Sequence, residues 1–198
     1  KLLNKRTSED DDAVANLYLN RGYLFYQLVP IERNVRGDSI DLEMRMFEGP
    51  QARINRVVIN GNDRLYERVI RRELRVKPGE LFSKDDLMRS AREIATTGQF
   101  NPETMDVRPE PNEDDGTVDI IFNLESKPSD QLELSFGWGQ TGIIGKVGVK
   151  FTNFSIANLL HPSRYRGIIP QGDGQTLTIS AQTNARYYQA YSFSFLDP

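Results

Sequence analysis

The sequence contains no cysteine and only one histidine, His161. Without cysteine the chain can form no disulfide bond and cannot use a cysteine nucleophile. A lone histidine leaves the common zinc sites and histidine-based catalytic triads without the side chains they require. The surrounding sequence, Leu160-His161-Pro162, is typical of a loop. We therefore expect no catalytic site, no metal site and no cofactor.

Long apolar runs and a strong charge of one sign are also missing. No stretch approaches the ~20 apolar residues that a transmembrane helix needs, although the strands of a membrane barrel alternate and need no such run. A net charge of −3, from 25 basic and 28 acidic residues, gives no reason to expect a nucleic-acid partner. No signal peptide is visible and the chain begins at Lys1, so we expect a piece of a longer precursor.

A small module occurs twice in the first two thirds of the chain. Ser8-Glu9-Asp10-Asp11 and Ser83-Lys84-Asp85-Asp86 each open an apolar stretch with helical spacing, which ends near Gly22 and Gly98 respectively. Two alternating segments follow each helix. The last of them carries Ile40, Leu42, Met44 and Met46 in the first copy and Val118, Ile120, Phe122 and Leu124 in the second. Matching helix starts, helix ends and final strands indicate a tandem module.

The two copies differ in completeness. Residues 1–48 contain a helix capped by Ser8 and strands at 24–33 and 39–47, of which the second is expected to be half-buried. Residues 49–127 contain a strand at 53–59, a helix carrying Tyr66, Ile70 and Leu74, and a helix capped by Ser83 with Leu87, Ala91 and Ile94 facing inward. Strands at about 104–109 and 117–125 complete this copy. The order strand, helix, helix, strand, strand predicts a two-layer α+β domain.

After Pro128 the pattern changes to strands alone. Leu132, Leu134, Phe136 and Trp138 lie on one face of the first strand, and glycine, serine and charged residues lie on the other. Further strands are expected near 143–152, 175–185 and 187–196, with a loop at about 153–173. Strands of about ten residues with one aromatic-rich face are typical of an outer-membrane barrel. A soluble β-sandwich is the alternative, because it produces similar alternation.

Three stretches of the second module carry a resemblance to a known family. They are Val58-Ile59-Asn60-Gly61-Asn62, Val69-Ile70-Arg71-Arg72-Glu73-Leu74 and Pro78-Gly79-Glu80-Leu81-Phe82-Ser83. Together they are similar to BamA-type outer-membrane assembly factors, in which polypeptide-transport-associated (POTRA) domains precede a barrel. Asn158-Leu159-Leu160, Gly172-Asp173-Gly174 and Asp197-Pro198 resemble early barrel landmarks of this family. Gln99-Phe100-Asn101-Pro102 departs from its pattern, and Pro102, Pro109 and Pro111 put the pairing of that strand in doubt.

The resemblance implies the fold and the domains. The fold class is α+β, with tandem POTRA modules (β-α-α-β-β) followed by antiparallel strands of an incomplete outer-membrane barrel. Residues 1–48 would be the later part of the penultimate POTRA domain, residues 49–127 the last POTRA domain, and residues 128–198 the first four barrel strands. The protein would lie in the cell outer membrane with its POTRA domains in the periplasm.

The resemblance also implies a function without catalysis, the assembly and insertion of β-barrel proteins into the outer membrane. Its partners would be unfolded outer-membrane β-barrel proteins, accessory periplasmic lipoproteins and outer-membrane lipid, with no nucleic acid. An exposed POTRA edge strand could bind clients by backbone pairing, which tolerates many sequences. The first barrel strand would open laterally, since glycine weakens strand pairing.

Three groups of residues are candidates for these tasks. The client-binding edges are Leu24, Phe25, Tyr26, Gln27, Leu28 and Val29, and Thr104, Met105, Asp106 and Val107. The candidate docking site for accessory proteins, on a helix with Arg64 and Arg75, comprises Arg68, Arg71, Arg72 and Glu73. The first-strand gate comprises Leu132, Leu134, Phe136, Gly137, Trp138 and Gly139.

Other interpretations are weaker or stay open. Arg36-Gly37-Asp38-Ser39 spells an integrin-binding tripeptide, but a hairpin turn needs these residue types in any case. The glycines at 137–145 lack the Gly-Lys-Ser/Thr ending of a phosphate loop. Two alternatives share the POTRA and barrel plan: a two-partner secretion exporter that moves one dedicated client, and a barrel that anchors a patatin-like lipase.

Overall fold

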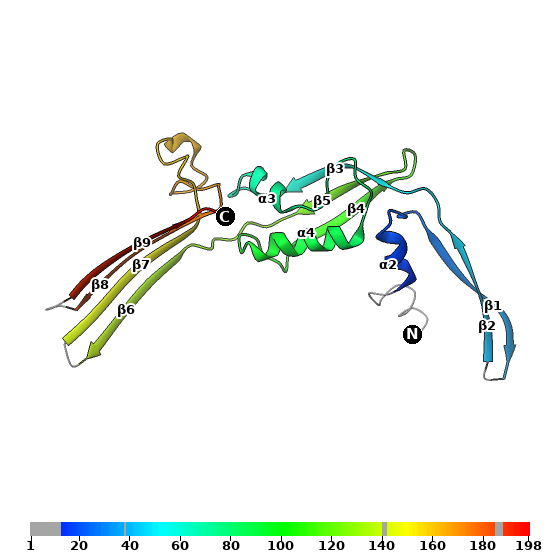
Figure 1. The fold of residues 1–198 in the computed structure, drawn as a ribbon, viewed down its shortest axis with the longest axis horizontal. Coiled ribbons are helices and arrows are strands. Elements are labelled where there is room, and N and C mark those ends of the chain that lie inside the picture. Colours follow the sequence, from blue (N-terminus) through cyan, green and yellow to red (C-terminus); the bar gives the residue numbers. More distant parts are fainter. Residues whose placement is uncertain (1–12, 38, 140–141, 185–187) are drawn as a thin grey trace. The chain divides into compact units, whose positions relative to one another are not determined.

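The computed structural model describes residues 13–37, 39–139, 142–184 and 188–198 (Figure 1). Backbone contacts divide the chain into two compact units. The first unit comprises Lys1–Asn60, Leu74–Glu93 and Asp106–Asn123, and the second comprises Gly61–Glu73, Ile94–Met105 and Leu124–Pro198. The predicted cap at Ser8, the turn residue Asp38, the turn at Gln140-Thr141 and the strand residue Tyr187 lie outside the described residues.

The first unit opens with helix α2 (Val14–Leu19) and a hairpin of β1 (Gln27–Arg36) and β2 (Ser39–Phe47). α2 ends at Leu19, and the turn that follows it closes at Gly22, close to the predicted helix end. This glycine has a φ of +87°, and the N–H of Tyr23 donates to the carbonyl of Tyr18 at 3.1 Å. β1 and β2 form an antiparallel two-stranded sheet. β1 begins at Gln27, three residues later than the predicted start at 24.

The prediction that the strand at 39–47 is half-buried is wrong. Ile40, Leu42 and Met44 are 53%, 42% and 40% exposed, so the apolar face of β2 is open to solvent. Within the described residues β2 pairs with β1 alone. A two-stranded ribbon has no second layer against which this face could be buried.

The first unit also contains a three-stranded sheet in the order β3-β5-β4. β3 (Arg53–Asn60) runs parallel to β5 (Thr117–Asn123), and β4 (Asp106–Asn112) runs antiparallel to it. The central strand presents Val118, Ile120 and Phe122 to one face, and each of these side chains is 0% exposed. The alternation predicted for this strand is therefore confirmed. β4 is shifted from the predicted 104–109 to 106–112 and passes through Pro109 and Pro111.

Two helices lie between β3 and β4 in the sequence, α3 (Glu67–Glu73) and α4 (Lys84–Thr96). Ser83 caps α4 as predicted, because its hydroxyl oxygen accepts the N–H of Asp86 at 3.2 Å. α3 is shorter than the basic helix predicted, and Arg64 and Arg75 lie outside it. No helix in the described part of the chain is long and apolar enough to cross a membrane.

The second unit contains a four-stranded antiparallel sheet of β6 (Gln131–Gly139), β7 (Gly142–Phe154), β8 (Gln175–Asn184) and β9 (Tyr188–Leu196). The strands pair in sequence order. The connection of residues 155–174 between β7 and β8 contains the short 3-10 helix η2 (Pro162–Arg164). The strands predicted after Pro128 are thus present, with boundaries shifted by a few residues.

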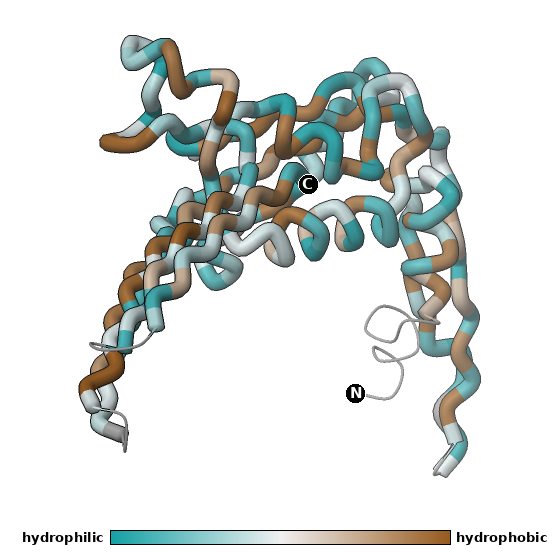
Figure 2. Tube along the Cα trace, turned by 60° about the vertical axis from the view of Figure 1, so that its left-hand side comes forward, coloured by the Kyte–Doolittle hydropathy of each residue, from teal (hydrophilic) through white to brown (hydrophobic). Residues whose placement is uncertain are grey.

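Hydrophobic and hydrophilic residues alternate along the strands of this sheet (Figure 2), so its two faces differ in polarity. The strand register places Leu134 opposite Val147 and Ile179 opposite Phe193 on the apolar face. Trp138 and Phe193 on this face are 85% and 71% exposed. On the other face Lys146 Nζ lies 2.8 Å from a carboxylate oxygen of Glu133. Such a sheet needs either a second layer or lipid against its apolar face.

Candidate functional site

The first predicted client-binding edge coincides only partly with β1. Gln27, Leu28 and Val29 lie in the strand, whereas Leu24, Phe25 and Tyr26 precede it. β1 pairs with β2 on one side and with no other strand in the described residues, so its second side is open. This part of the prediction therefore coincides with an unpaired strand edge over three residues.

Pro30 determines which amide groups of β1 face the open side. It lies opposite Met44 of β2, and proline has no N–H to donate. Because hydrogen-bonded and non-hydrogen-bonded pairs alternate in an antiparallel ladder, Val29 and Ile31 must make the bonds to β2 around Pro30. By the same alternation, the N–H of Leu28 points to the open side. Leu28 is thus the residue of the predicted edge whose amide could bind another strand.

The second predicted edge coincides still less with a strand. Thr104 and Met105 precede β4, and only Asp106 and Val107 lie in it. Pro109 and Pro111 lie opposite Ile120 and Val118 of β5. Because proline has no N–H to donate to a partner strand, the backbone nitrogens of both prolines must face the open side of β4. The open side of this strand therefore carries carbonyl groups at 107, 109 and 111 but an amide only at Val107.

The four predicted docking residues all lie in α3 and engage other groups of the chain. Arg71 Nε donates to Glu67 at 2.8 Å, and Arg72 Nε donates to Glu73 at 3.1 Å. Arg68 forms an ion pair with Asp173, and this hydrogen bond raises the pKa of the Arg68 guanidinium above its ordinary value. The arginines nevertheless keep a large exposed surface, with Arg68 being 69% exposed.

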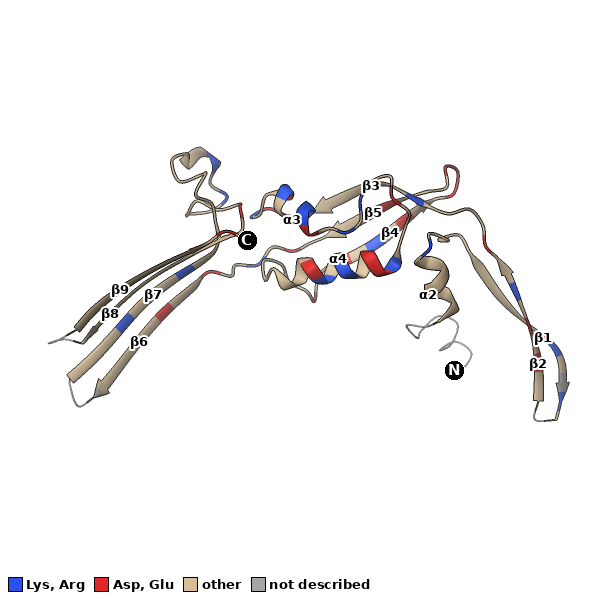
Figure 3. Ribbon diagram, in the orientation of Figure 1, with Lys and Arg blue, Asp and Glu red and all other residues tan. Residues whose placement is uncertain are grey.

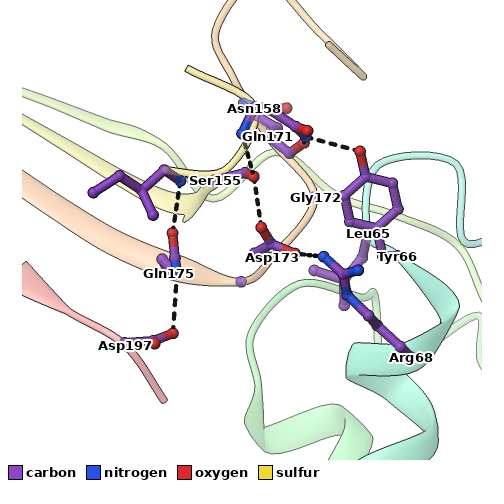
Figure 4. Close-up of polar contacts among 12 residues, drawn as sticks. Leu65, Tyr66, Arg68, Ser155, Asn158, Gln171, Gly172, Asp173, Gln175 and Asp197 are labelled. Carbon is purple, nitrogen blue, oxygen red and sulfur yellow. Dashed lines mark hydrogen bonds and ion pairs between the residues drawn. The ribbon is translucent and has the colours of Figure 1, made fainter. Parts of the chain in front are cut away.

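Arg68 belongs to a polar network that the sequence did not predict (Figure 4). Its partner Asp173 also accepts the Ser155 hydroxyl at 2.6 Å. Asn158 donates from its amide to the Tyr66 hydroxyl at 2.8 Å and to the carbonyl of Gln171 at 3.0 Å. Gln175 extends the network, accepting the N–H of Ile156 and donating to Asp197 at 3.2 Å. Ser155, Asn158, Gln171 and Gln175 are all buried.

Asn153 and Gly172 fasten the connection of residues 155–174 beside Tyr66. Asn153 Nδ2 donates to the carbonyl of Arg64 at 2.7 Å, and its Oδ1 accepts the N–H groups of Gly172 and Gly174. The carbonyl of Gly172 accepts the N–H of Tyr66 at 2.8 Å. A Cβ at Gly172 would lie 2.4 Å from the Tyr66 ring, so only glycine fits here.

Three segments that resemble family landmarks, at 158–160, 172–174 and 197–198, each contribute to this network. The sequence analysis did not assign Asn153 and Ser155 to any site, and it placed Arg64 and Tyr66 on a helix, although both precede α3. The sequence signal that could have identified this network is a polar side chain directly after a predicted strand or beside a pair of glycines.

The site contains no recognisable catalytic arrangement. Among the described residues no group of three or more histidine, cysteine, aspartate or glutamate side chains could hold a metal ion. His161 lies on the exposed connection, with Nδ1 3.4 Å from the carbonyl of Ala157. The arrangement can bind and position other groups through backbone edges, arginines and apolar surfaces.

The predicted gate residues all lie in β6. Gly137 and Gly139 pair with Ile144 and Gly142 of β7, and the other side of β6 has no partner within the described residues. Leu132, Leu134, Phe136 and Trp138 are between 58% and 85% exposed on the apolar face. β6 is therefore an edge strand of the sheet.

Comparisons with known proteins agree with this architecture. Residues 52–127 match the POTRA family model, described as a surface antigen variable number repeat. The outer membrane protein assembly factor BamA of Neisseria meningitidis is 28% identical over 142 residues, covering 71% of this chain. BamA of Nitratidesulfovibrio vulgaris is 25% identical over 142 residues, covering 70% of the chain.

A solved structure shows the same fold. The crystal structure of BamA from Haemophilus ducreyi lacking POTRA domains 1–3 matches 92% of this chain with a TM-score of 0.69 at 17% identity. The chain covers 18% of the length of each of the two sequence relatives and 31% of this structure. The resemblance to BamA-type factors and the predicted α+β fold class are confirmed, and the POTRA match covers residues 52–127.

We expect Asn153→Ala to loosen the connection of residues 155–174. The substitution removes the side-chain partners of the Arg64 carbonyl and the Gly174 N–H, and an unsatisfied buried group costs about 1–3 kcal/mol. Hydrogen–deuterium exchange of peptides from this connection should accelerate about tenfold. Asn60→Ala, which removes an exposed amide contact to Asn123, is the matched control. Unchanged exchange in Asn153→Ala would contradict the role assigned to this side chain.

Proposed function

We propose that this chain is part of a BamA-type protein that folds and inserts β-barrel proteins into the outer membrane, in keeping with its confirmed resemblance to that family. The observation that carries the proposal is a POTRA domain followed directly by a sheet with one exposed apolar face. In this proposal residues 1–48 end the preceding POTRA domain, and residues 128–198 form the first barrel strands. The work requires no catalysis, and the POTRA domains lie in the periplasm.

Client binding in this proposal uses the open side of β1. An unfolded outer-membrane protein would add as a further strand, and pairing through backbone groups suits a chaperone with many clients. The open side of β1 is interrupted by one proline, Pro30, and keeps the Leu28 N–H, whereas two prolines leave the open side of β4 an amide only at Val107. The exposed apolar side chains of β2, such as Leu42 and Met44, would add nonspecific affinity for an unfolded chain.

Insertion in this proposal uses β6 as a gate. Its unpaired side would meet the last strand of the complete barrel, and the glycines at 137 and 139 would weaken that contact. α3, with its exposed Arg71 and Arg72, would serve as a docking site for accessory periplasmic lipoproteins.

Depletion of the full-length protein in its host tests the function as a whole. Quantitative proteomics of the outer membrane should show many unrelated barrel proteins falling together, because they share one assembly route. Loss of a single secreted protein, with other barrels unchanged, would instead identify an exporter of a dedicated client.

Leu28→Pro should weaken client binding by the full-length protein, because it removes the amide that faces the open side of β1. The β1–β2 ladder should persist, since the hydrogen bonds around this position come from Gln27 and Val29. Crosslinking of an unfolded barrel client to the periplasmic region provides the measurement. Leu28→Ala is the control, because it removes the side chain and keeps the amide. Equal crosslinking by the two variants would count against this edge.

A reversible lock tests the gate. A disulfide between cysteine introduced at Leu134 and the last barrel strand of the full-length protein should abolish assembly, and reduction should restore it. The matched control joins Val147 and Ala181, which are already partners in β7 and β8, by the same chemistry. Assembly at the normal rate with the gate locked would refute lateral opening.

A further inference from the structure

The connection of residues 155–174 is unusually long for its place in the sheet. It spans twenty residues, whereas two residues (140–141) separate β6 from β7 and three (185–187) separate β8 from β9. It leaves β7 at the end of the sheet where the chain enters β6 from the POTRA domain. In outer-membrane barrels the turns at the periplasmic end are normally the short ones. The additional residues at this end therefore call for a physical explanation.

One side of this connection is fixed and the other is open. Ser155, Asn158 and Gln171 are buried in the network of Figure 4. In contrast, Leu160 is 85% exposed and Ile168 is 99% exposed. Ile156 and Leu159 are also at least half exposed, and hydrophobic positions recur along the connection in Figure 2. A cluster of large exposed aliphatic side chains on an anchored loop marks an interaction surface.

The charge of the exposed segment has one sign. Residues 156–169 contain Arg164 and Arg166 and no aspartate or glutamate, and the connection carries basic colouring in Figure 3. Arg164 is exposed, and its side chain makes no hydrogen bond or ion pair with the part of the chain that the structure describes. Both arginines line an open cavity of about 510 Å³, together with Tyr66, Arg68 and Asn158. This lining contains cationic and hydrogen-bonding groups and no carboxylate.

Arg166 gives this cavity a fixed cationic wall. Its Nη1 donates to the carbonyls of Asn62 and Leu65, at 2.9 Å each, and its guanidinium lies 4.6 Å from the centroid of the Tyr66 ring. The orientation of Arg166 is therefore set before any ligand arrives. Arg164 lines the same cavity, and its side chain has no hydrogen-bond or ion-pair partner among the described residues. A fixed and a free guanidinium on one cavity suit a phosphate group, which arginine binds through paired hydrogen bonds.

We propose that this connection is a lipid-contact site on the membrane leaflet that faces the POTRA domain. Leu160 and Ile168 enter the border of the acyl region, and Arg164 and Arg166 bind the phosphate of an anionic phospholipid headgroup. Aliphatic side chains flanked by arginines form the composition that favours a membrane interface. This inference rests on the proposed function, because it requires strands β6 to β9 to lie in the membrane.

Depth measurements on the full-length protein test the site. Single cysteines replacing Ile168, Phe136 or Met88 are spin-labelled in vesicles of phosphatidylethanolamine and phosphatidylglycerol. Collision rates with oxygen and with a water-soluble nickel complex then report depth. We expect the label at 168 to lie at the headgroup level, the label at 136 in the acyl region and the label at 88 in water. Met88 is the control, because it is an aliphatic residue of α4 that is 53% exposed.

The two proposals fail in different ways. A label at 136 in the acyl region with a label at 168 in water would overturn the lipid-contact site and leave the proposed function intact. A label at 136 in water would overturn the membrane placement of the strands, and the lipid-contact site with it.

Headgroup recognition is tested with brominated lipids and a fluorophore at residue 168. Quenching by brominated phosphatidylglycerol should exceed quenching by brominated phosphatidylcholine, and Arg164→Gln should reduce this preference about fivefold. Arg92→Gln, which neutralises an exposed arginine of α4, should leave it unchanged. Inorganic phosphate at equal concentration should not compete, because the site requires the lipid as a whole. Equal quenching by the two lipids, or competition by free phosphate, would overturn the assignment.

Discussion

The hydrogen bonds of Asn153 hold the second unit together at the point where its strands meet its loops. One side chain satisfies the carbonyl of Arg64 and the N–H of Gly174, and it also accepts from Gly172. Because Asn153 is only 3% exposed, water cannot replace these hydrogen bonds. The passage of Gly172 against the Tyr66 ring, and the ion pair of Asp173 with Arg68, both depend on this placement. A long connection thereby becomes a fixed part of the structure.

The sheet of the second unit imposes a second constraint. On its polar face, side chains of neighbouring strands pair with one another. Glu133 forms an ion pair with Lys146, and the hydroxyl oxygens of Ser180 and Ser192 lie 2.7 Å apart. Its apolar face has no covering layer in the described residues. The hydrophobic effect therefore demands an apolar environment on one side only. The connection of residues 155–174 lies at one end of this sheet. If the apolar face is covered by lipid, this end lies where the lipid meets water, and exposed aliphatic and cationic residues suit such a boundary.

Much of the fold follows from local patterns. Period-two alternation was sufficient for β5 through β9, and the Ser83 cap and Gly22 marked real helix ends because these signals depend on neighbouring residues alone. The burial of β2 could not be predicted, because it depends on which layer covers it. The path of β4 through Pro109 and Pro111 was missed because proline in an edge strand depends on the side from which the partner comes. The polar network joins Arg64 to Asn153 and Tyr66 to Asn158, and no periodicity relates residues so far apart in sequence.

The prolines of β4 affect how readily copies of this protein associate with one another when they are crowded together. Two copies of a small sheet can join edge to edge, and repetition of that contact produces ordered aggregates of cross-β type. Along the open side of β4, Pro109 and Pro111 remove two of the three amide donors that a neighbouring copy would need, and only that of Val107 remains. The one remaining amide, that of Val107, is too few to hold the strand of a second copy against this edge. Pro109 and Pro111, which made the bounds of β4 hard to predict, thus protect this sheet from joining edge to edge with the same sheet of other copies.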